Sequence, residues 1–199
     1  MDRKRLVIDL FCEDRGHEQF ARAMLRRLAD EDGLRPPEIN PGTIRGGHGR
    51  AIEELRLWQR MGRGRGDLLV VLIDANGEGW HQQRANVEAA VMPVRRNALV
   101  IGCPDPHIEA WIAADLDAVH RVLGVRLQPP TGRKVNYKAW LGTALMASGV
   151  HGLTDPADVA LDVIPQLDLF RAGKASASLR DFIDTARSAL RSVGAHGAP

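Results

Sequence analysis

The sequence predicts an α/β protein with a mostly parallel central sheet flanked by helices, followed by a C-terminal helical extension. Three observations lead to this fold class. Short apolar runs recur through the first two-thirds of the 199 residues, as in strands that are buried on both faces. Segments with apolar residues at helical spacing separate these runs, and further helical segments follow the last run. Strands that alternate with helices in this way are typical of a parallel sheet.

The first half of the predicted sheet comes from two strand–helix pairs. Residues 5–11 (RLVIDLF) are a nearly continuous apolar run, which predicts a strand buried on both faces. Residues 16–30 carry four large apolar side chains on one stripe at helical spacing. Residues 38–44 are a weaker second strand, and residues 49–60 are a second helix with one apolar face.

The second half repeats this alternation. Residues 68–73 (LLVVLI) are the strongest strand in the chain, and residues 80–91 are predicted to be helical. Residues 98–102 (ALVIG) are another buried strand, and helices are expected from about 107 to 123. The alternation therefore continues to about residue 123.

The remainder of the chain is predicted to be helical. We assign residues 1–123 to an α/β core and residues 124–199 to a helical extension packed on it. Asp155 and Ser176 stand where helix N-caps are expected. The sequence leaves open whether these helices form a separate domain or cap the sheet. The predicted helices are 136–147, 155–164 and 176–192.

Composition excludes several classes of protein. Hydrophobic residues make up 44% and charged residues 26% of the chain, which is ordinary for a globular protein. We expect no membrane span, because no apolar stretch reaches about 18 residues. The short apolar run near the N-terminus is followed at once by acids, so we expect no signal peptide and a cytoplasmic location. Cys12 and Cys103 end apolar runs and are expected to be buried free thiols, without a disulfide framework.

Basic residues are concentrated in one segment, although the net charge is only +2. Arginines among glycines suit contact with phosphate, since the guanidinium group forks to two oxygens and the backbone can approach closely. A solvated loop and helix face is the alternative interpretation. The arginines of this segment are Arg45, Arg50, Arg56, Arg60, Arg63 and Arg65.

Acidic side chains follow three of the predicted strands, at the edge of the sheet where functional groups collect in parallel folds. Clustered carboxylates repel one another unless a cation neutralises them, and oxygen ligands favour Mg²⁺ or Mn²⁺. The sequence therefore predicts a divalent metal site centred on Glu13 and Asp74, which follow buried strands directly. The polar residues after the first, third and fourth strands are Glu13, Asp14, His17 and Glu18; Asp74, Asn76 and Glu78; and Asp105, His107 and Glu109.

Other interpretations of these residues are open. Asp14, Glu78 and Asp105 are expected to be helix caps or first-turn charges. His17 and His107 suggest zinc, but their spacing matches no compact zinc motif. There is no nucleophile elbow and no phosphate-binding P-loop. Carboxylates of Glu13 and Asp74 more than about 8 Å apart would exclude one shared metal ion, given metal–oxygen distances near 2.0–2.6 Å.

Several motifs, in order along most of the chain, resemble the TOPRIM (topoisomerase–primase) pattern of a strand ending in Glu and a later strand ending in Asp-x-Asp. The closer resemblance is to small phage-defence proteins akin to the nuclease domain of the overcoming-lysogenization-defect family. The terminal segment SASLRDFIDTARSAL resembles their closing helix. The matching elements are CEDRGHE with Glu13 and Glu18, LIDANGEG with Asp74 and Asn76, PDPHIEAWIAAD with Glu109, Trp111 and Asp115, and VNYKAWL with Lys138.

This resemblance implies a TOPRIM-like, Rossmann-like fold and metal-dependent phosphodiester cleavage of nucleic acid, with DNA expected ahead of RNA. It implies Mg²⁺ or Mn²⁺ as the cofactor and an ATPase as a partner. The protein is also expected to be able to form oligomers. A lysine, Lys138 or Lys134, would neutralise charge developing on the phosphate; a solvated basic turn is the alternative for both. The metal ligands implied are Glu13 and Asp74, completed by Asn76, Glu18 or Glu109, and the nucleic-acid contacts are Arg45, Arg50, Arg63, Arg65 and Lys134.

Two departures from the pattern support a different function. Asn76 stands where a second aspartate is expected, and Asp14 replaces the glycine after the first glutamate, with Gly16 two positions later. The amide of Asn76 removes one negative ligand. The alternative is a TOPRIM-like module that binds nucleic acid or a partner after losing catalysis. A third interpretation, a phosphorylated small molecule held by the loop GTIRGGHGR, fits less well because that loop does not join a clear strand to a clear helix.

Overall fold

The computed structural model describes residues 5–42, 50–130, 135–149 and 156–196. Within these ranges strands and helices alternate up to β4, and helices follow it. The strands are β1 (Val7–Cys12), β2 (Glu38–Pro41), β3 (Leu68–Leu72) and β4 (Leu99–Gly102). The α-helices are α1 (Arg15–Glu31), α2 (Ala51–Arg60), α3 (Trp80–Ala90), α4 (Ile108–Ile112), α5 (Leu116–Leu123), α6 (Tyr137–Ser148), α7 (Ala160–Val163), α8 (Leu169–Ala175) and α9 (Ala177–His196). Short 3₁₀ helices are η1 (Pro93–Ala98), η2 (Pro156–Val159) and η3 (Ile164–Gln166).

The four strands form one parallel sheet in the order β2-β1-β3-β4. This arrangement confirms the predicted fold class. β1 and β3 lie side by side at the centre, with Cys12 opposite Leu72 at their carboxyl ends. Side chains that follow these two strands are therefore neighbours in space.

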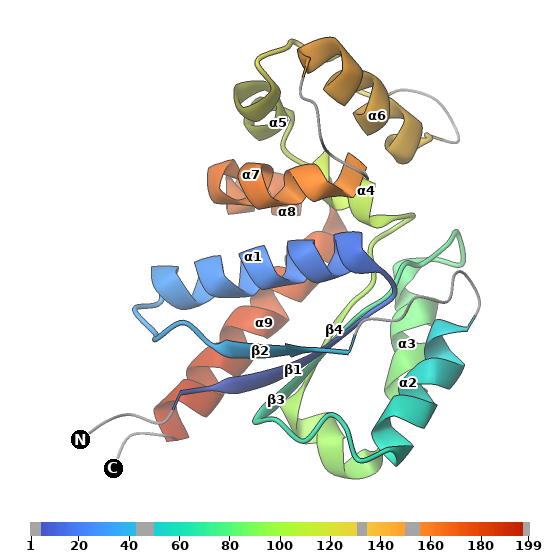
Figure 1. The fold of residues 1–199 in the computed structure, drawn as a ribbon, viewed down its shortest axis with the longest axis vertical. Coiled ribbons are helices and arrows are strands. Elements are labelled where there is room, and N and C mark those ends of the chain that lie inside the picture. The colour runs from blue at the N-terminus through green and yellow to red at the C-terminus, as the bar shows by residue number, and fades with distance from the viewer. Residues whose placement is uncertain (1–4, 43–49, 131–134, 150–155, 197–199) are drawn as a thin grey trace.

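Helices cover both faces of the sheet, as Figure 1 shows. α1 and α9 lie on one face, and α2 and α3 lie on the other. Successive side chains of a strand point to opposite faces, so Leu10 and Cys12 join the core under α1 whereas Phe11 joins the core under α2. The core under α1 contains an aromatic cluster in which Trp111 lies 5.4 Å from Phe20 and 5.3 Å from Phe182, between ring centroids.

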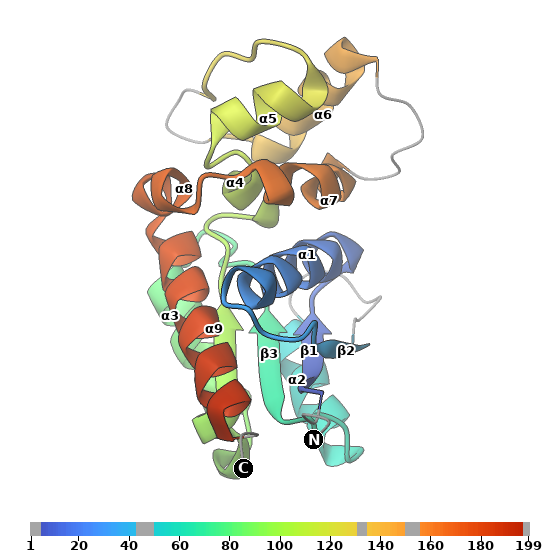
Figure 2. The ribbon, with the colours of Figure 1, turned by 90° about the vertical axis from the view of Figure 1, so that its left-hand side faces the viewer.

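The C-terminal helices occupy two places. α4 to α8 lie beyond the carboxyl ends of the strands, and α9 returns along the sheet (Figure 2). α9 packs on β4 and α1, and Ser176 caps it by accepting a hydrogen bond from the backbone N–H of Leu179 (3.3 Å). The sequence did not predict α8 as a separate helix. Residues 156–164 of the predicted helix at 155–164 belong to the short helices η2, α7 and η3, and the predicted cap Asp155 lies outside the described residues. The domain boundary after residue 123 stays a prediction.

Two further sequence predictions concern the cysteines and the membrane. Cys12 and Cys103 are buried and free, as predicted. Among the described residues, no helix combines the length and the apolar character that crossing a membrane requires.

Gly102, the last residue of β4, offers a test of this packing. A Cβ atom there would lie 2.1 Å from Leu72 Cδ1 and 2.9 Å from Phe182 Cδ2. We predict that Gly102→Ala lowers the free energy of unfolding by about 1–3 kcal/mol, because overpacking forces neighbouring side chains from their preferred rotamers. Urea denaturation followed by circular dichroism measures this change.

Gly173 in α8 provides a matched control. The nearest atom to a Cβ there is the Cβ of Arg180 at 3.3 Å, and alanine favours the helix over glycine. Gly173→Ala should therefore change the free energy of unfolding by less than about 1 kcal/mol. Equal effects at both positions would contradict the packing described for Gly102.

Candidate metal centre

Glu13 and Asp74 meet beyond the carboxyl ends of the two central strands. Glu13 directly follows β1, and Asp74 lies two residues beyond β3. The ladder between these strands continues for one more residue, since the N–H of Glu13 donates to the carbonyl of Leu72 (3.1 Å). Glu13 Oε2 in turn accepts a hydrogen bond from the backbone N–H of Asp74 (3.1 Å). Both side chains are buried, at 6% and 5% exposure.

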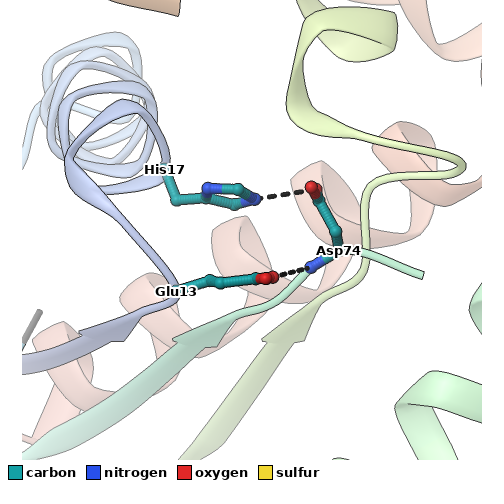
Figure 3. Close-up of side chains that lie close together, drawn as sticks. All are labelled: Glu13, His17 and Asp74. Carbon is teal, nitrogen blue, oxygen red and sulfur yellow. Dashed lines mark hydrogen bonds and ion pairs between the residues drawn. The ribbon is translucent and has the colours of Figure 1, made fainter. Parts of the chain in front are cut away.

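His17 is the third member of this group, and it comes from the first turn of α1. Asp14 is the N-cap of that helix, and its Oδ1 accepts the backbone N–H of His17 (3.0 Å). The same carboxylate contacts His17 Nδ1 at 2.7 Å. His17 Nε2 lies 2.7 Å from Asp74 Oδ1 (Figure 3). The buried imidazole therefore bridges the helix cap and the strand end.

The distances suit one ion. Glu13, His17 and Asp74 each offer a ligand atom, and these atoms all lie within 4.8 Å of one another. Two oxygens bound to the same cation at 2.0–2.6 Å are at most about 5.2 Å apart. The carboxylates therefore lie well inside the 8 Å separation that would exclude a shared ion. Glu13, His17 and Asp74 form a group that could hold a metal ion.

The protein itself places a positive charge in this group. Burial alone would lower the pKa of His17, but the charge of Asp74 and the hydrogen bonds to Asp14 and Asp74 outweigh it and raise the pKa to about 10. Burial alone would raise the pKa of Asp74, yet the neighbouring histidines, His17 first, hold it below its usual value. At neutral pH His17 is therefore an imidazolium ion between two carboxylates.

A second histidine contacts the same aspartate from the neighbouring strand. His107 follows β4, and its Nδ1 lies 3.2 Å from Asp74 Oδ2. This hydrogen bond raises the pKa of His107, while burial opposes the change. His107 is more exposed than His17, at 39% of its side chain against 1%. The carboxylate of Asp74 thus has an imidazole on each oxygen.

These residues border a cavity of about 380 Å³. Glu109, on α4, is buried, whereas Lys138, in the first turn of α6, is exposed. Three residues that the sequence predicted for the site, Asp74, Glu109 and Lys138, therefore face the same space. The cavity is lined by Asp14, His17, Asp74, His107, Ile108, Glu109, Val135, Asn136 and Lys138.

Three predicted ligands are not part of this cavity lining: Glu13, which belongs to the buried group itself, and Glu18 and Asn76. Glu18 forms an ion pair with Arg22, one turn further along α1, with 2.8 Å between Oε1 and Nε. Asn76 is exposed in the turn after β3, where its φ is 51° and its Nδ2 lies 3.4 Å from the carbonyl oxygen of Asp74. The structure therefore does not bring either side chain into the group of Glu13, His17 and Asp74.

The predicted nucleic-acid contacts are also separate from the group. Arg50 is exposed next to α2, and Arg63 and Arg65 are exposed beside another cavity, of about 680 Å³. That cavity includes Val7 and Asp67, at the amino ends of β1 and β3. It also includes Pro41, which pairs with Leu10, so along β1 it reaches to about 10 Å from Glu13, but it shares no lining residue with the cavity beside the metal group. The two other predicted contacts, Arg45 and Lys134, lie outside the described residues.

Sequence reasoning missed the role of His17. It considered His17 together with His107 as zinc ligands but did not place either beside Asp74. One signal was present: Asp14 is a helix cap directly after the first strand, so a residue three positions later lies in the first turn and faces the edge of the sheet. His17 occupies that position.

In comparisons with known proteins, no family model, no curated protein and no solved structure matched this chain. The family resemblance therefore stays a prediction from the sequence, and the geometry of the group is the basis for proposing a function.

We predict that His17→Gln lowers the free energy of unfolding by roughly 3–5 kcal/mol below pH 6.5, because it leaves the buried carboxylate of Asp74 without this cationic partner. The pKa of His17 rises from 6.5 to about 10 on folding. The proton therefore stabilises the folded protein fully below pH 6.5, and this stabilisation is lost as the pH rises to about 10. Denaturation of wild type and variant across this range should show the difference shrinking with pH.

Glu53→Gln, at an exposed acid in α2, is the control for this experiment. It should change the free energy of unfolding by no more than about 0.5 kcal/mol at any pH. A difference between wild type and His17→Gln that stays constant from pH 6.5 to about 10 would mean that His17 is neutral in the folded protein.

Proposed function

We propose that this protein is a metal-dependent nuclease that cleaves phosphodiester bonds in nucleic acid. The observation that carries the proposal is the convergence of Glu13, His17 and Asp74 on a point that one ion can reach. The cavity beside this group also contains the carboxylate of Glu109 and the ammonium group of Lys138. A metal site with a neighbouring acid and a neighbouring cation is the combination that phosphoryl transfer requires.

The donor set favours Mn²⁺ among the hard divalent ions. Carboxylate oxygens suit Mg²⁺ and Mn²⁺ alike, whereas an imidazole nitrogen suits later transition metals better than Mg²⁺. Glu13 and Asp74 would supply oxygens, and His17 would supply a buried nitrogen once it has lost its proton and its hydrogen bond to Asp74. The proposed cofactor is therefore Mn²⁺, with Mg²⁺ as the weaker alternative.

Each residue has a role that its position permits. When bound, the ion supplies a Lewis acid for a phosphoryl oxygen and an acidified water molecule. Lys138, at the open side of the cavity, neutralises charge that develops on the phosphate. Glu109 is buried in the lining of the same cavity and orients the attacking water by accepting its hydrogen bond.

The wider setting of this activity comes from the sequence resemblance. The TOPRIM-like proteins that this chain resembles act in phage defence or DNA processing, and the resemblance also implies a partner ATPase. We therefore propose DNA ahead of RNA as substrate and an ATPase as partner. Lysine and arginine contacts to the backbone would hold the strand with little dependence on sequence.

A specific observation supports a second function, that of a binding module without catalysis. The His17 imidazolium already neutralises the carboxylates through a 2.7 Å contact with Asp74, so the fold can be stable without a metal. Asn76 also replaces the second acid of the TOPRIM-like motif and is turned toward the backbone. In that case the same surface would bind nucleic acid without cleaving it.

We predict that the wild-type protein cleaves plasmid and single-stranded DNA with Mn²⁺, and more slowly with Mg²⁺. Asp74→Asn should reduce the rate at least about 100-fold, because it removes a charged ligand while keeping the shape of the side chain. Agarose gels and a fluorogenic single-strand substrate measure these rates.

Glu53→Gln removes one exposed acid on α2 that belongs neither to the metal group nor to its cavity lining, and should cleave at the wild-type rate. Cleavage that persists unchanged in Asp74→Asn would point to a contaminating nuclease. No cleavage by the wild type, together with salt-sensitive DNA binding, would support the binding module instead.

Metal binding should also be visible without substrate. We predict that Mn²⁺ at about 100 times its dissociation constant stabilises the folded protein by about 2.7 kcal/mol, and that Mg²⁺ at the same concentration stabilises it less. Glu13→Gln should abolish most of this effect, whereas Glu53→Gln should keep it. Thermal denaturation by calorimetry tests this, and equal stabilisation of wild type and Glu13→Gln would contradict the site.

A further inference from the structure

A second cavity, of about 420 Å³, lies beside the metal group and has a different character. Its size is in the range of small-molecule sites. Two aromatic rings line it: Trp80, at the start of α3, and Tyr137, at the start of α6. Asp105 is the acidic residue of the lining. Most of the remaining residues have short side chains and come from α4, the turn after it and the α8–α9 junction, such as Ala110, Ala113, Ser176 and Ser178, and Leu116 and Pro130 complete the lining.

This cavity is adjacent to the one beside the metal group, because residues that are close together in the sequence line one cavity or the other. In the loop after β4, His107 lines the metal-side cavity and Asp105 lines the second one. In the first turn of α6, Lys138 lines the metal-side cavity and Tyr137 lines the second one. A substrate whose phosphate reaches Lys138 can therefore place an adjoining nucleoside beside Tyr137.

The polar groups of the second cavity suit a base and not a phosphate. Asp105 Oδ2 accepts the backbone N–H of Trp80 (3.2 Å), which fixes the carboxylate at the start of α3. The other oxygen can accept a further hydrogen bond, and the negative charge disfavours a phosphate. The ring of Trp80 is held by stacking on His81, with 3.6 Å between ring centroids. A planar base with an amino group matches these contacts.

We propose that this cavity binds one unpaired nucleobase of the substrate strand, adjacent to the scissile phosphate, and that it prefers bases with an exocyclic amino group. The inference rests on the proposed function, since it names the part of the substrate that the same surface recognises. Aromatic rings bind any base by stacking. Asp105 adds selectivity, because a carboxylate accepts a hydrogen bond from the N4 amino group of cytosine, whereas thymine offers a carbonyl oxygen at that position.

The test compares single-stranded oligonucleotides of deoxycytidine and of thymidine, of equal length and charge. Fluorescence anisotropy in the presence of EDTA measures binding without cleavage. The wild type should bind the cytidine strand about tenfold more tightly. Asp105→Asn keeps an acceptor for the N–H of Trp80 but adds an amide donor, so the preference should fall to about twofold or less. Equal affinity for the two strands in the wild type, or an unchanged preference in Asp105→Asn, would overturn the proposal.

Tyr137 provides the second arm. Tyr137→Leu should weaken binding of both strands about tenfold, because stacking is lost, and Tyr137→Phe should retain it. Phe170→Leu changes an aromatic ring in α8 that is 73% exposed and not part of the cavity lining, so its affinity should match the wild type. Binding that is unchanged in Tyr137→Leu, or no binding of either strand by the wild type, also overturns the proposal.

Failure of this proposal and failure of the nuclease proposal are distinguishable. A wild type that prefers cytidine but cleaves neither strand with Mn²⁺ would support the base cavity and contradict the nuclease. A wild type that cleaves both strands equally, without a binding preference, would support the nuclease and contradict the base cavity.

Discussion

Buried negative charge at the carboxyl ends of β1 and β3 is the constraint on which this structure depends. Glu13 and Asp74 are each less than one-tenth exposed, and burying an ionised carboxylate without a partner is costly. The N–H of Asp74 satisfies Glu13, and the imidazolium of His17 satisfies Asp74. The two central strands, the connection after β1 and the first turn of α1 are all arranged around these contacts.

The position of His17 has its own electrostatic cost. A positive charge in the first turn of a helix faces the positive end of the helix dipole. Asp14 offsets this, because its carboxylate caps the helix and contacts His17 Nδ1 at the same time, which holds the pKa of Asp14 at about 2. A histidine at this position is therefore better explained by its contact with Asp74 than by the local stability of α1. This is why we assign the group to function and not to helix capping alone.

The sequence predicted the parts of this arrangement that depend on local patterns. Continuous apolar runs located β1 and β3, and a parallel sheet then placed Glu13 and Asp74 at the same edge. It could not predict that α1 leans over β3 so that His17 reaches Asp74, because strand order and helix placement depend on packing between distant segments. Glu18 and Asn76 were chosen from motif position, but Glu18 lies one residue past His17 on a different face of α1. The helix α8 was missed because its seven residues end at the cap of α9.

The helices beyond the sheet give the metal group its surroundings. α4 is only five residues long, yet Glu109 and Ala110 within it point into two different cavities. In the first turn of α6, Tyr137 lines one of these cavities and Lys138 lines the other, because successive residues of a helix project about 100° apart. One short turn can therefore supply a cation to a phosphate and an aromatic ring to the base attached to it. In the proposed complex, the fixed separation of these two side chains would make recognition of the base and positioning of the phosphate consequences of a single docking geometry.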